Sequence, residues 1–273
     1  MEGKPPEILP VKSLPETDDR PLHPHLPKPP ALLLMIAPIR CGKSTIISNL
    51  LLNSNFFGQD YFDETIVFSP TIHNDKTSRF LRKAATCYDT YDDDTLQGII
   101  DDQSSYEDKS MRPSIALILD DIIGVFKGKG GREPMINSLC SRFRHYGIDL
   151  LLMSSQNYRR VNPVIRSNAT HMIIGSPFPN VKELNKIFEE MGDSFGGAAN
   201  MAIYRKATPQ KYDFLYLDLT ENPPVAYKNF QEKIAVGGQG YADIVAKGQF
   251  NMGEVKPKVA SLKDTPIDEK KNQ

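Results

Sequence analysis

The sequence predicts an α/β fold in which a mostly parallel sheet carries helices on both faces. Short apolar runs with the length of buried strands recur along residues 31–220, and segments with helical spacing lie between several of them. A strand that is buried on both faces reads as a continuous apolar run, and strands that alternate with helices favour parallel pairing. The composition, with 40% hydrophobic and 25% charged residues, is typical of a globular domain with a sizeable core.

Each predicted element has its own local signal. The helix Ser44–Asn53 places aliphatic residues at helical spacing, and the helix Pro134–Tyr146 has proline in its first turn and Gly147 directly after its end. The strands are recognised by apolar density over a short length. They are Leu32–Ile36, Thr65–Ser69, Ile115–Asp120, Asp149–Ser154, Thr170–Gly175 and Phe214–Leu219.

The chain divides into three parts by composition. Nine of the 21 prolines fall within the first 30 residues, which therefore cannot sustain a helix or a central strand. We predict an extended arm over residues 1–30, one folded α/β domain over residues 31–238, and a loose tail rich in Gly, Lys and Asp over residues 239–273.

Several classes of protein are disfavoured. No apolar run approaches the ~20 residues needed to cross a bilayer, so no membrane partner is expected. No basic segment followed by an apolar one marks a secretory signal at the N-terminus. The cysteines are few, odd in number and widely spaced, which fits a reducing compartment and argues against a disulfide framework or a zinc site.

A phosphate-binding motif lies between the first predicted strand and the first predicted helix. Such a loop surrounds the β-phosphate with backbone N–H groups, and the next helix presents its positive N-terminus. Lys43 would reach the β- and γ-phosphates, and Ser44 would offer its hydroxyl to Mg²⁺. The predicted nucleotide-binding residues are Ala37, Pro38, Ile39, Arg40, Cys41, Gly42, Lys43, Ser44 and Thr45.

Ala37 stands where the usual motif has glycine. Pro38 follows it, and the residue before a proline is held in the extended region with negative φ. A Cβ at position 37 therefore costs little, and we expect a working nucleotide site with Mg²⁺. The alternative is that Gly-Lys-Ser-Thr serves only as the start of a helix.

Two further motifs follow strands that come later in the chain. "SIALILDDIIG" ends a buried strand in two carboxylates, as a Walker B motif does: Asp120 would hold Mg²⁺ and Asp121 would polarise the attacking water. "GIDLLLMSSQNYRR" ends the next strand in Gln156, which is placed to sense the γ-phosphate or to orient water. The alternatives are an exposed strand end or a helix N-cap for the two aspartates, and a plain junction between strand and loop for Gln156.

Together these motifs resemble the FtsK–HerA superfamily of DNA-pumping ATPases, over about residues 31–220. The segment "RFRHYGIDLLLMSSQNYRRVNPVIRSNATHMIIG" is similar to the virion packaging ATPases of the poxvirus type, found in large DNA viruses and virophages. Arg144-His145, Gln156 and Ile165–Asn168 carry the specific part of this resemblance. It implies a RecA-like P-loop NTPase of the ASCE class that hydrolyses ATP with Mg²⁺.

The resemblance also implies roles for arginines and for partners. An arginine before the fourth strand, Arg144 or Arg142, would reach the γ-phosphate bound by a neighbouring subunit, and Arg166 could be a second sensor. The expected assembly is a homo-oligomeric ring that moves double-stranded DNA into a viral capsid and docks on a capsid or vertex protein. The expected location is the host cell cytoplasm or a viral factory, with association with the virion as a further option.

Charge distribution leaves the DNA contact open. Residues 127–166 hold eight Lys and Arg against two acidic residues, and "KGKGGR" at 127–132 is either a loop that touches DNA phosphates or a solvated loop. Two alternatives to the packaging motor also remain: a helicase or other DNA translocase of the same ATPase class, and a slow nucleotide-binding protein associated with the capsid.

Overall fold

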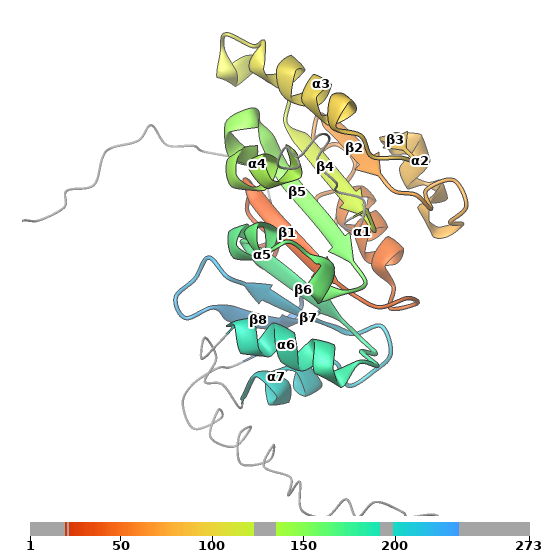
Figure 1. Ribbon diagram of the computed structural model, residues 1–273, viewed down its shortest axis with the longest axis vertical. Helices are drawn as coiled ribbons and strands as arrows, with labels where there is room; N and C mark the ends of the chain where they lie inside the picture. The colour runs from red at the N-terminus through yellow and green to blue at the C-terminus, as the bar shows by residue number, and fades with distance from the viewer. Residues whose placement is uncertain (1–19, 21, 123–134, 192–198, 235–273) are drawn as a thin grey trace, which may run out of the picture.

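A nine-stranded sheet runs through the centre of the computed structural model, which describes residues 20, 22–122, 135–191 and 199–234 (Figure 1). The strand order is β3-β2-β4-β5-β1-β6-β7-β8-β9, parallel from β3 to β6 and antiparallel from β6 to β9. The strands are β1 (Ala31–Ile36), β2 (Glu64–Phe68), β3 (Thr86–Tyr88), β4 (Ile115–Asp120), β5 (Ile148–Ser155), β6 (His171–Gly175), β7 (Phe214–Asp218), β8 (Val225–Lys228) and β9 (Glu232–Ile234).

Helices cover both faces of this sheet, so the predicted α/β class is confirmed. One hydrophobic layer joins the sheet to α3, α4, α5, α6 and α7, and the other joins it to α1 and α2 (Figure 1). Their bounds are α1 (Lys43–Leu52), α2 (Leu81–Ala84), α3 (Asp93–Ser104), α4 (Met135–Arg142), α5 (Pro163–Asn168), α6 (Val181–Met191) and α7 (Ala199–Ala207).

The six predicted strands are present, each within one residue of the expected bounds. Their central members are buried on both faces, as the continuous apolar runs indicated: every residue of β1 and of β4 is buried. The sequence did not indicate β3, β8 or β9. Each has only three or four residues and contains exposed or half-buried positions, so it lacks apolar density.

The second predicted helix changes form near its end. α4 runs to Arg142, and a 3₁₀ turn, η4 (Phe143–Tyr146), continues it to Gly147. Gly147 has φ 70°, a left-handed conformation that glycine adopts easily, so it ends the turn as expected. Pro134 lies outside the described residues.

The described part of the Pro-rich arm, residues 20 and 22–30, forms no helix or strand and lies against the domain. Leu26 is buried in the same hydrophobic layer as α1, and Nδ1 of His25 lies 2.7 Å from the carbonyl oxygen of Phe230. Arg20 stacks on Tyr61 and lies 3.3 Å from Asp149. The rest of the arm, the loop 127–132 and the tail 239–273 lie outside the described residues.

Candidate functional site

The phosphate-binding motif forms a turn between β1 and α1. Gly42 is the N-cap of α1 with φ 85°, and a Cβ built on it would lie 3.6 Å from Cδ1 of Tyr212. Glycine suits this position through its left-handed conformation, whereas the distance to Tyr212 is an ordinary van der Waals contact. The first turn of α1 contains no acidic residue, so the positive end of the helix is open to an anion.

Ala37 is accommodated by a glycine on the neighbouring strand. The backbone N–H of Ala37 donates to the carbonyl of Ser155 at 3.0 Å, and Ala37 is not among the described residues with positive φ, as its position before proline predicted. A Cβ built on Gly175 of β6 would lie only 2.6 Å from Cβ of Ala37 and 3.4 Å from Cβ of Cys41. Gly175 thus leaves the space that the methyl group of Ala37 fills.

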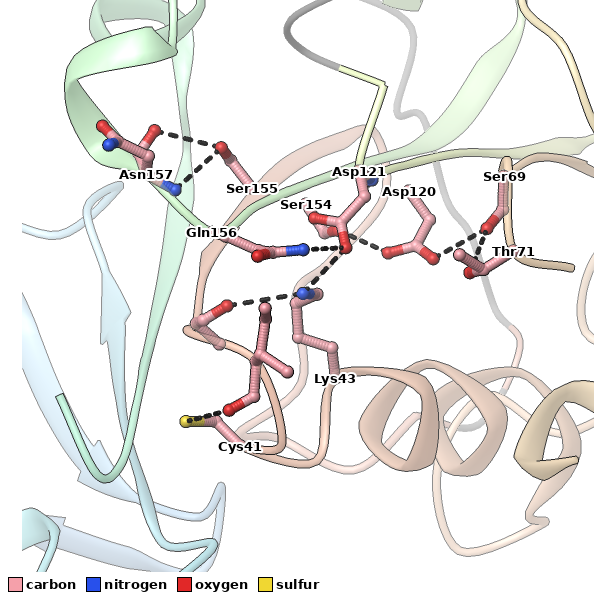
Figure 2. Close-up of polar contacts among 12 residues, drawn as sticks. Cys41, Lys43, Ser69, Thr71, Asp120, Asp121, Ser154, Ser155, Gln156 and Asn157 are labelled. Carbon is pink, nitrogen blue, oxygen red and sulfur yellow. Dashed lines mark hydrogen bonds and ion pairs between the residues drawn. The ribbon is translucent and has the colours of Figure 1, made fainter. Parts of the chain in front are cut away.

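The strand order brings the three motifs to one edge of the sheet. β5 lies between β1 and β4, and all three are parallel, so their carboxyl ends meet at the same edge. Nζ of Lys43 lies 2.9 Å from Oδ2 of Asp121 and 3.4 Å from the carbonyl oxygen of Ala37. Gln156 donates from Nε2 to the same Oδ2 of Asp121 at 2.9 Å. Figure 2 shows Asp121 between these two side chains.

The backbone turns at Asp121, directly after the last residue of β4. The φ of Asp121 is 55°, a left-handed conformation that aspartate adopts more often than most residues, and its N–H donates to Oγ of Ser154 at 3.2 Å. Its carboxylate contacts Lys43 and Gln156, whereas the carboxylate of Asp120 accepts from Ser69 and Ser154. Two adjacent carboxylates are thereby given different surroundings.

Asp120 is the buried member of the pair, with 8% exposure. Ser69 donates to its Oδ2 at 2.9 Å and Ser154 to its Oδ1 at 2.5 Å (Figure 2). Burial raises the pKa of Asp120, and the negative charge of Asp121 raises it further, while the hydrogen bonds from Ser154 and Ser69 oppose both. The two serines orient the carboxylate within an otherwise apolar strand end.

A cleft of about 1040 Å³ opens in front of these residues. It is lined by the phosphate-binding loop, by both carboxylates and Gln156, and by the segments around β7 and β8. Asp75 and Tyr212 are among the lining residues that the sequence motifs did not indicate. No local pattern marks either one, because each lies in a loop that only the tertiary fold brings to the motif.

Asp75 adds a third carboxylate to the cleft. It accepts hydrogen bonds from the hydroxyl of Ser44, from the backbone of Thr77 at 2.9 Å and from the hydroxyl of Ser78 at 2.8 Å. Burial alone would raise the pKa of Asp75, but these hydrogen bonds outweigh it and lower the pKa.

The oxygen ligands in the cleft fit Mg²⁺ bound together with a nucleotide. Ser44, Asp75 and Asp120 all line it, and Mg²⁺ is commonly held by one or two carboxylates plus substrate phosphates. Within the described ranges, no group of three or more His, Cys, Asp or Glu side chains could hold a metal ion by itself. The site therefore suits an ion that arrives with phosphate ligands.

The three predicted arginines do not line this cleft within the described part of the chain. Arg142 ends α4 and Arg144 lies in η4, and both are exposed at the amino end of β5, opposite the phosphate-binding loop. Arg166 of α5 pairs with Glu190 and lies over the ring of Tyr158, 4.8 Å from its centre. Tyr158 donates to the same Glu190 at 2.9 Å. Arg166 is thus placed between helices rather than at the reaction centre of its own chain.

Known proteins resemble this chain in fold, whereas comparisons of sequence found no match. No protein-family model matches the sequence, and no curated protein matches it. The genome packaging NTPase B204 from Sulfolobus turreted icosahedral virus 2, solved in complex with AMP, matches 72% of this chain and 96% of its own, with 19% identity and a TM-score of 0.53. The DNA-packaging ATPase B204 from Sulfolobus turreted icosahedral virus matches 73% of this chain and 98% of its own, with 17% identity and a TM-score of 0.54. This chain therefore shares its fold with nearly the whole length of that ATPase.

The structure also bears on the membrane. In the part of the chain that it describes, no helix has the length and apolar character required to span a bilayer.

Proposed function

We propose that this protein is a Mg²⁺-dependent ATPase that moves double-stranded DNA into a viral capsid. The observation that carries the proposal is the convergence of Lys43, Asp121 and Gln156 at one sheet edge, in a fold shared with a genome packaging NTPase. The resemblance of residues 142–175 to virion packaging ATPases supports the same assignment.

The residues of the cleft divide the work of hydrolysis. The loop before α1 and Lys43 would bind the phosphates, and the contact of Lys43 with Asp121 would weaken as the ammonium group turns toward phosphate oxygens. Oδ2 of Asp121 would then be free to polarise a water molecule, with Gln156 orienting the carboxylate through its amide. Ser44 and Asp120 would hold Mg²⁺, which when bound offsets negative charge on the β- and γ-phosphates.

The motor would work as a homo-oligomeric ring. Arg144 and Arg142 are exposed at the sheet edge opposite their own cleft, so a neighbouring subunit's nucleotide is the one they could approach. An arginine supplied in trans stabilises charge on the transferring phosphoryl group. Contacts to DNA phosphates suffice for such a motor, because a translocase must be indifferent to sequence. Its further partner would be a capsid or vertex protein, in the host cytoplasm, a viral factory or the virion.

The test is ATP hydrolysis measured with and without duplex DNA, beside a strand-separation assay on the same preparation. We expect duplex DNA of any sequence to stimulate hydrolysis, with no separated strands. Separation of the strands would favour a helicase of the same ATPase class. Nucleotide binding with turnover that duplex DNA leaves unchanged would favour a slow nucleotide-binding protein associated with the capsid.

A further inference from the structure

The nucleotide cleft continues past the phosphate-binding loop to a surface with no role in phosphate chemistry. At this end it is lined by Tyr212, which precedes β7, and by Phe56 and Phe230. Phe230 is buried, whereas Tyr212 is 55% exposed. Across the same cleft, Ile39 of the phosphate-binding loop is 70% exposed. Exposed large apolar side chains that line one concave surface usually mark a binding site.

Tyr212 is held in place by the turn that carries it. The next residue, Asp213, accepts hydrogen bonds from the backbone of Gln210 at 3.0 Å and from the side chain of Asn229 at 2.7 Å. Asn229 in turn accepts from the backbone N–H of Phe214 at 2.8 Å. This turn places the ring of Tyr212 beside Gly42, at the start of α1.

The conformation of Tyr212 is also unusual for its residue type. Its φ is 74°, a left-handed value that suits glycine or asparagine far better than an aromatic residue. An aromatic ring kept in such a conformation and left exposed contributes little to the core. Strain of this kind concentrates at functional sites.

We propose that Tyr212 stacks on the base of the bound nucleotide and that the site recognises the face of the base rather than its edge. This inference rests on the proposed function and adds the base to the phosphate site. Nζ of Lys211 lies over the ring of Tyr212, 4.7 Å from its centre, and occupies one face, which leaves the other face for a base. Stacking on an aromatic ring is open to every base, because every base has a π face.

The amides that line this part of the cleft are poorly placed to select one base. Asn229 is bound to Asp213 and Phe214, as described above. Asn49 donates to the carbonyl of Thr45 at 2.9 Å and accepts from Asn53 at 3.1 Å. Gln231 is exposed, so water competes for its amide. ATP and GTP should therefore bind with similar affinity.

Calorimetric titration of the full chain with ATP, GTP and inorganic tripolyphosphate tests this proposal. For Tyr212→Ala we expect the Kd values of ATP and GTP to rise together by about tenfold, since alanine removes the stacking surface. The Kd of tripolyphosphate, which has no base, should not change. Tyr212→Phe should keep wild-type affinities, and Tyr106→Ala, at an exposed tyrosine outside the cleft, is the matched control.

Tyr212→Gly gives an independent readout. Glycine relieves the left-handed strain, so this variant should melt at a higher temperature than wild type and still bind ATP more weakly. If Tyr212 only supported the fold, Tyr212→Gly would lose thermal stability and ATP affinity together.

Three results would overturn the inference. They are an unchanged Kd of ATP in Tyr212→Ala, a parallel loss of tripolyphosphate affinity in that variant, and a wild-type preference above tenfold between ATP and GTP. Lys43→Ala separates this inference from the proposed function. If Lys43→Ala loses ATP binding and Tyr212→Ala does not, the phosphate site stands and only the base subsite is wrong. If the wild type binds neither ATP nor tripolyphosphate, both are wrong.

Discussion

Nζ of Lys43 and Oδ2 of Asp121 lie 2.9 Å apart, although Lys43 begins the helix that follows β1, Asp121 follows β4, and β5 lies between these two strands. This contact joins the phosphate-binding loop to the end of the Walker B strand. The lysine is 10% exposed and the carboxylate 21%, so both remain reachable from the cleft. Substitution of either side chain should therefore change the chemistry of the site without disturbing the core.

Lys43→Ala should abolish ATP hydrolysis while the protein stays folded. Loss of one preorganised charge that faces the reacting phosphates costs about 10²–10³-fold in rate or more. The lysine lies at the start of α1 rather than in the core, so circular dichroism and the melting temperature should stay near wild type. Hydrolysis by Lys43→Ala at the wild-type rate would contradict the assignment of the nucleotide site.

Asp120→Asn and Asp121→Asn should differ in what they lose. Asp120 is the buried carboxylate that we assign to Mg²⁺, so Asp120→Asn should weaken binding of Mg²⁺ with nucleotide. Asp121 faces Lys43 and Gln156, so Asp121→Asn should still bind ATP and lose turnover. Titration of Mg²⁺-ATP and single-turnover hydrolysis measure the two effects. If Asp121→Asn keeps most of its turnover, the catalytic base lies elsewhere, and Asp75 is the next carboxylate of the cleft to test.

Hydrolysis should require a neighbouring subunit. An arginine in trans accelerates phosphoryl transfer by roughly 10³–10⁵-fold, so specific activity should rise with protein concentration until the ring forms. Arg144→Ala should bind ATP normally and be almost inactive. Mixed with Lys43→Ala, it should recover some activity, because the Lys43→Ala subunit supplies an intact Arg144 to the site next door.

Two other arginines are the controls for this experiment. Arg142→Ala tests the exposed neighbour at the end of α4. Arg166→Ala removes an ion pair with Glu190 and a contact with Tyr158, so its main effect should be a loss of stability, measured by urea unfolding. If no arginine variant is rescued by mixing and specific activity is independent of concentration, the ring motor is wrong.

Gly175→Ala should destabilise the protein and disturb the nucleotide site. The added Cβ would lie 2.6 Å from Cβ of Ala37, which forces the strand ends apart. Overpacking of this kind costs about 1–3 kcal/mol. Ala37→Gly alone should change turnover only modestly, but combined with Gly175→Ala it should restore most of the lost free energy of unfolding. A double variant as unstable as Gly175→Ala alone would show that the two positions do not compensate.

The free energy of unfolding should fall in mild acid because of His171. Burial lowers the pKa of His171 to about 4, although Asp218 at 3.5 Å opposes this shift. The histidine of the unfolded chain titrates near ~6.5, so between these values the unfolded chain binds a proton that the folded chain does not. Stability from this group is therefore complete above pH ~6.5 and is lost on acidification toward pH 4, by up to about 3 kcal/mol.

The measurement for His171 is urea unfolding at pH values from 7 to 4. His171→Gln should have a flatter dependence on pH in this range, whereas His145→Gln, at an exposed histidine in η4, should keep the wild-type slope. Equal slopes in wild type and His171→Gln would assign the acid sensitivity to other groups.

The central strands and the three motifs could be predicted because their signals are local. β1 is apolar throughout and β4 and β5 are apolar along most of their length, and the residues at or after their carboxyl ends mark the site: Lys43, Asp120 with Asp121, and Gln156. The order β4-β5-β1 then makes one site of three separate stretches.

The remainder of the site depends on tertiary contacts that leave no local pattern. Asp75 reaches Ser44 from a loop after β2, and Tyr212 reaches Gly42 from a turn before β7. Gly175 could have been noticed as a glycine that ends an apolar strand, but its partner Ala37 is 138 positions away in the chain. The short strands β3, β8 and β9 were missed because half-buried segments of three or four residues resemble loops in sequence.

The length of β5 has a consequence for the geometry of the proposed ring. Its eight residues span about 26 Å, with η4 and Arg144 before its first residue and Gln156 after its last. In the proposed ring, one end of this strand touches a subunit's own reaction centre, and the other end faces the reaction centre of the next subunit. β5 is hydrogen-bonded to β1 on one side and to β4 on the other, so the distance between its two ends is held fixed. The spacing between the two points at which a subunit would act in the ring would then be set by the length of a single strand.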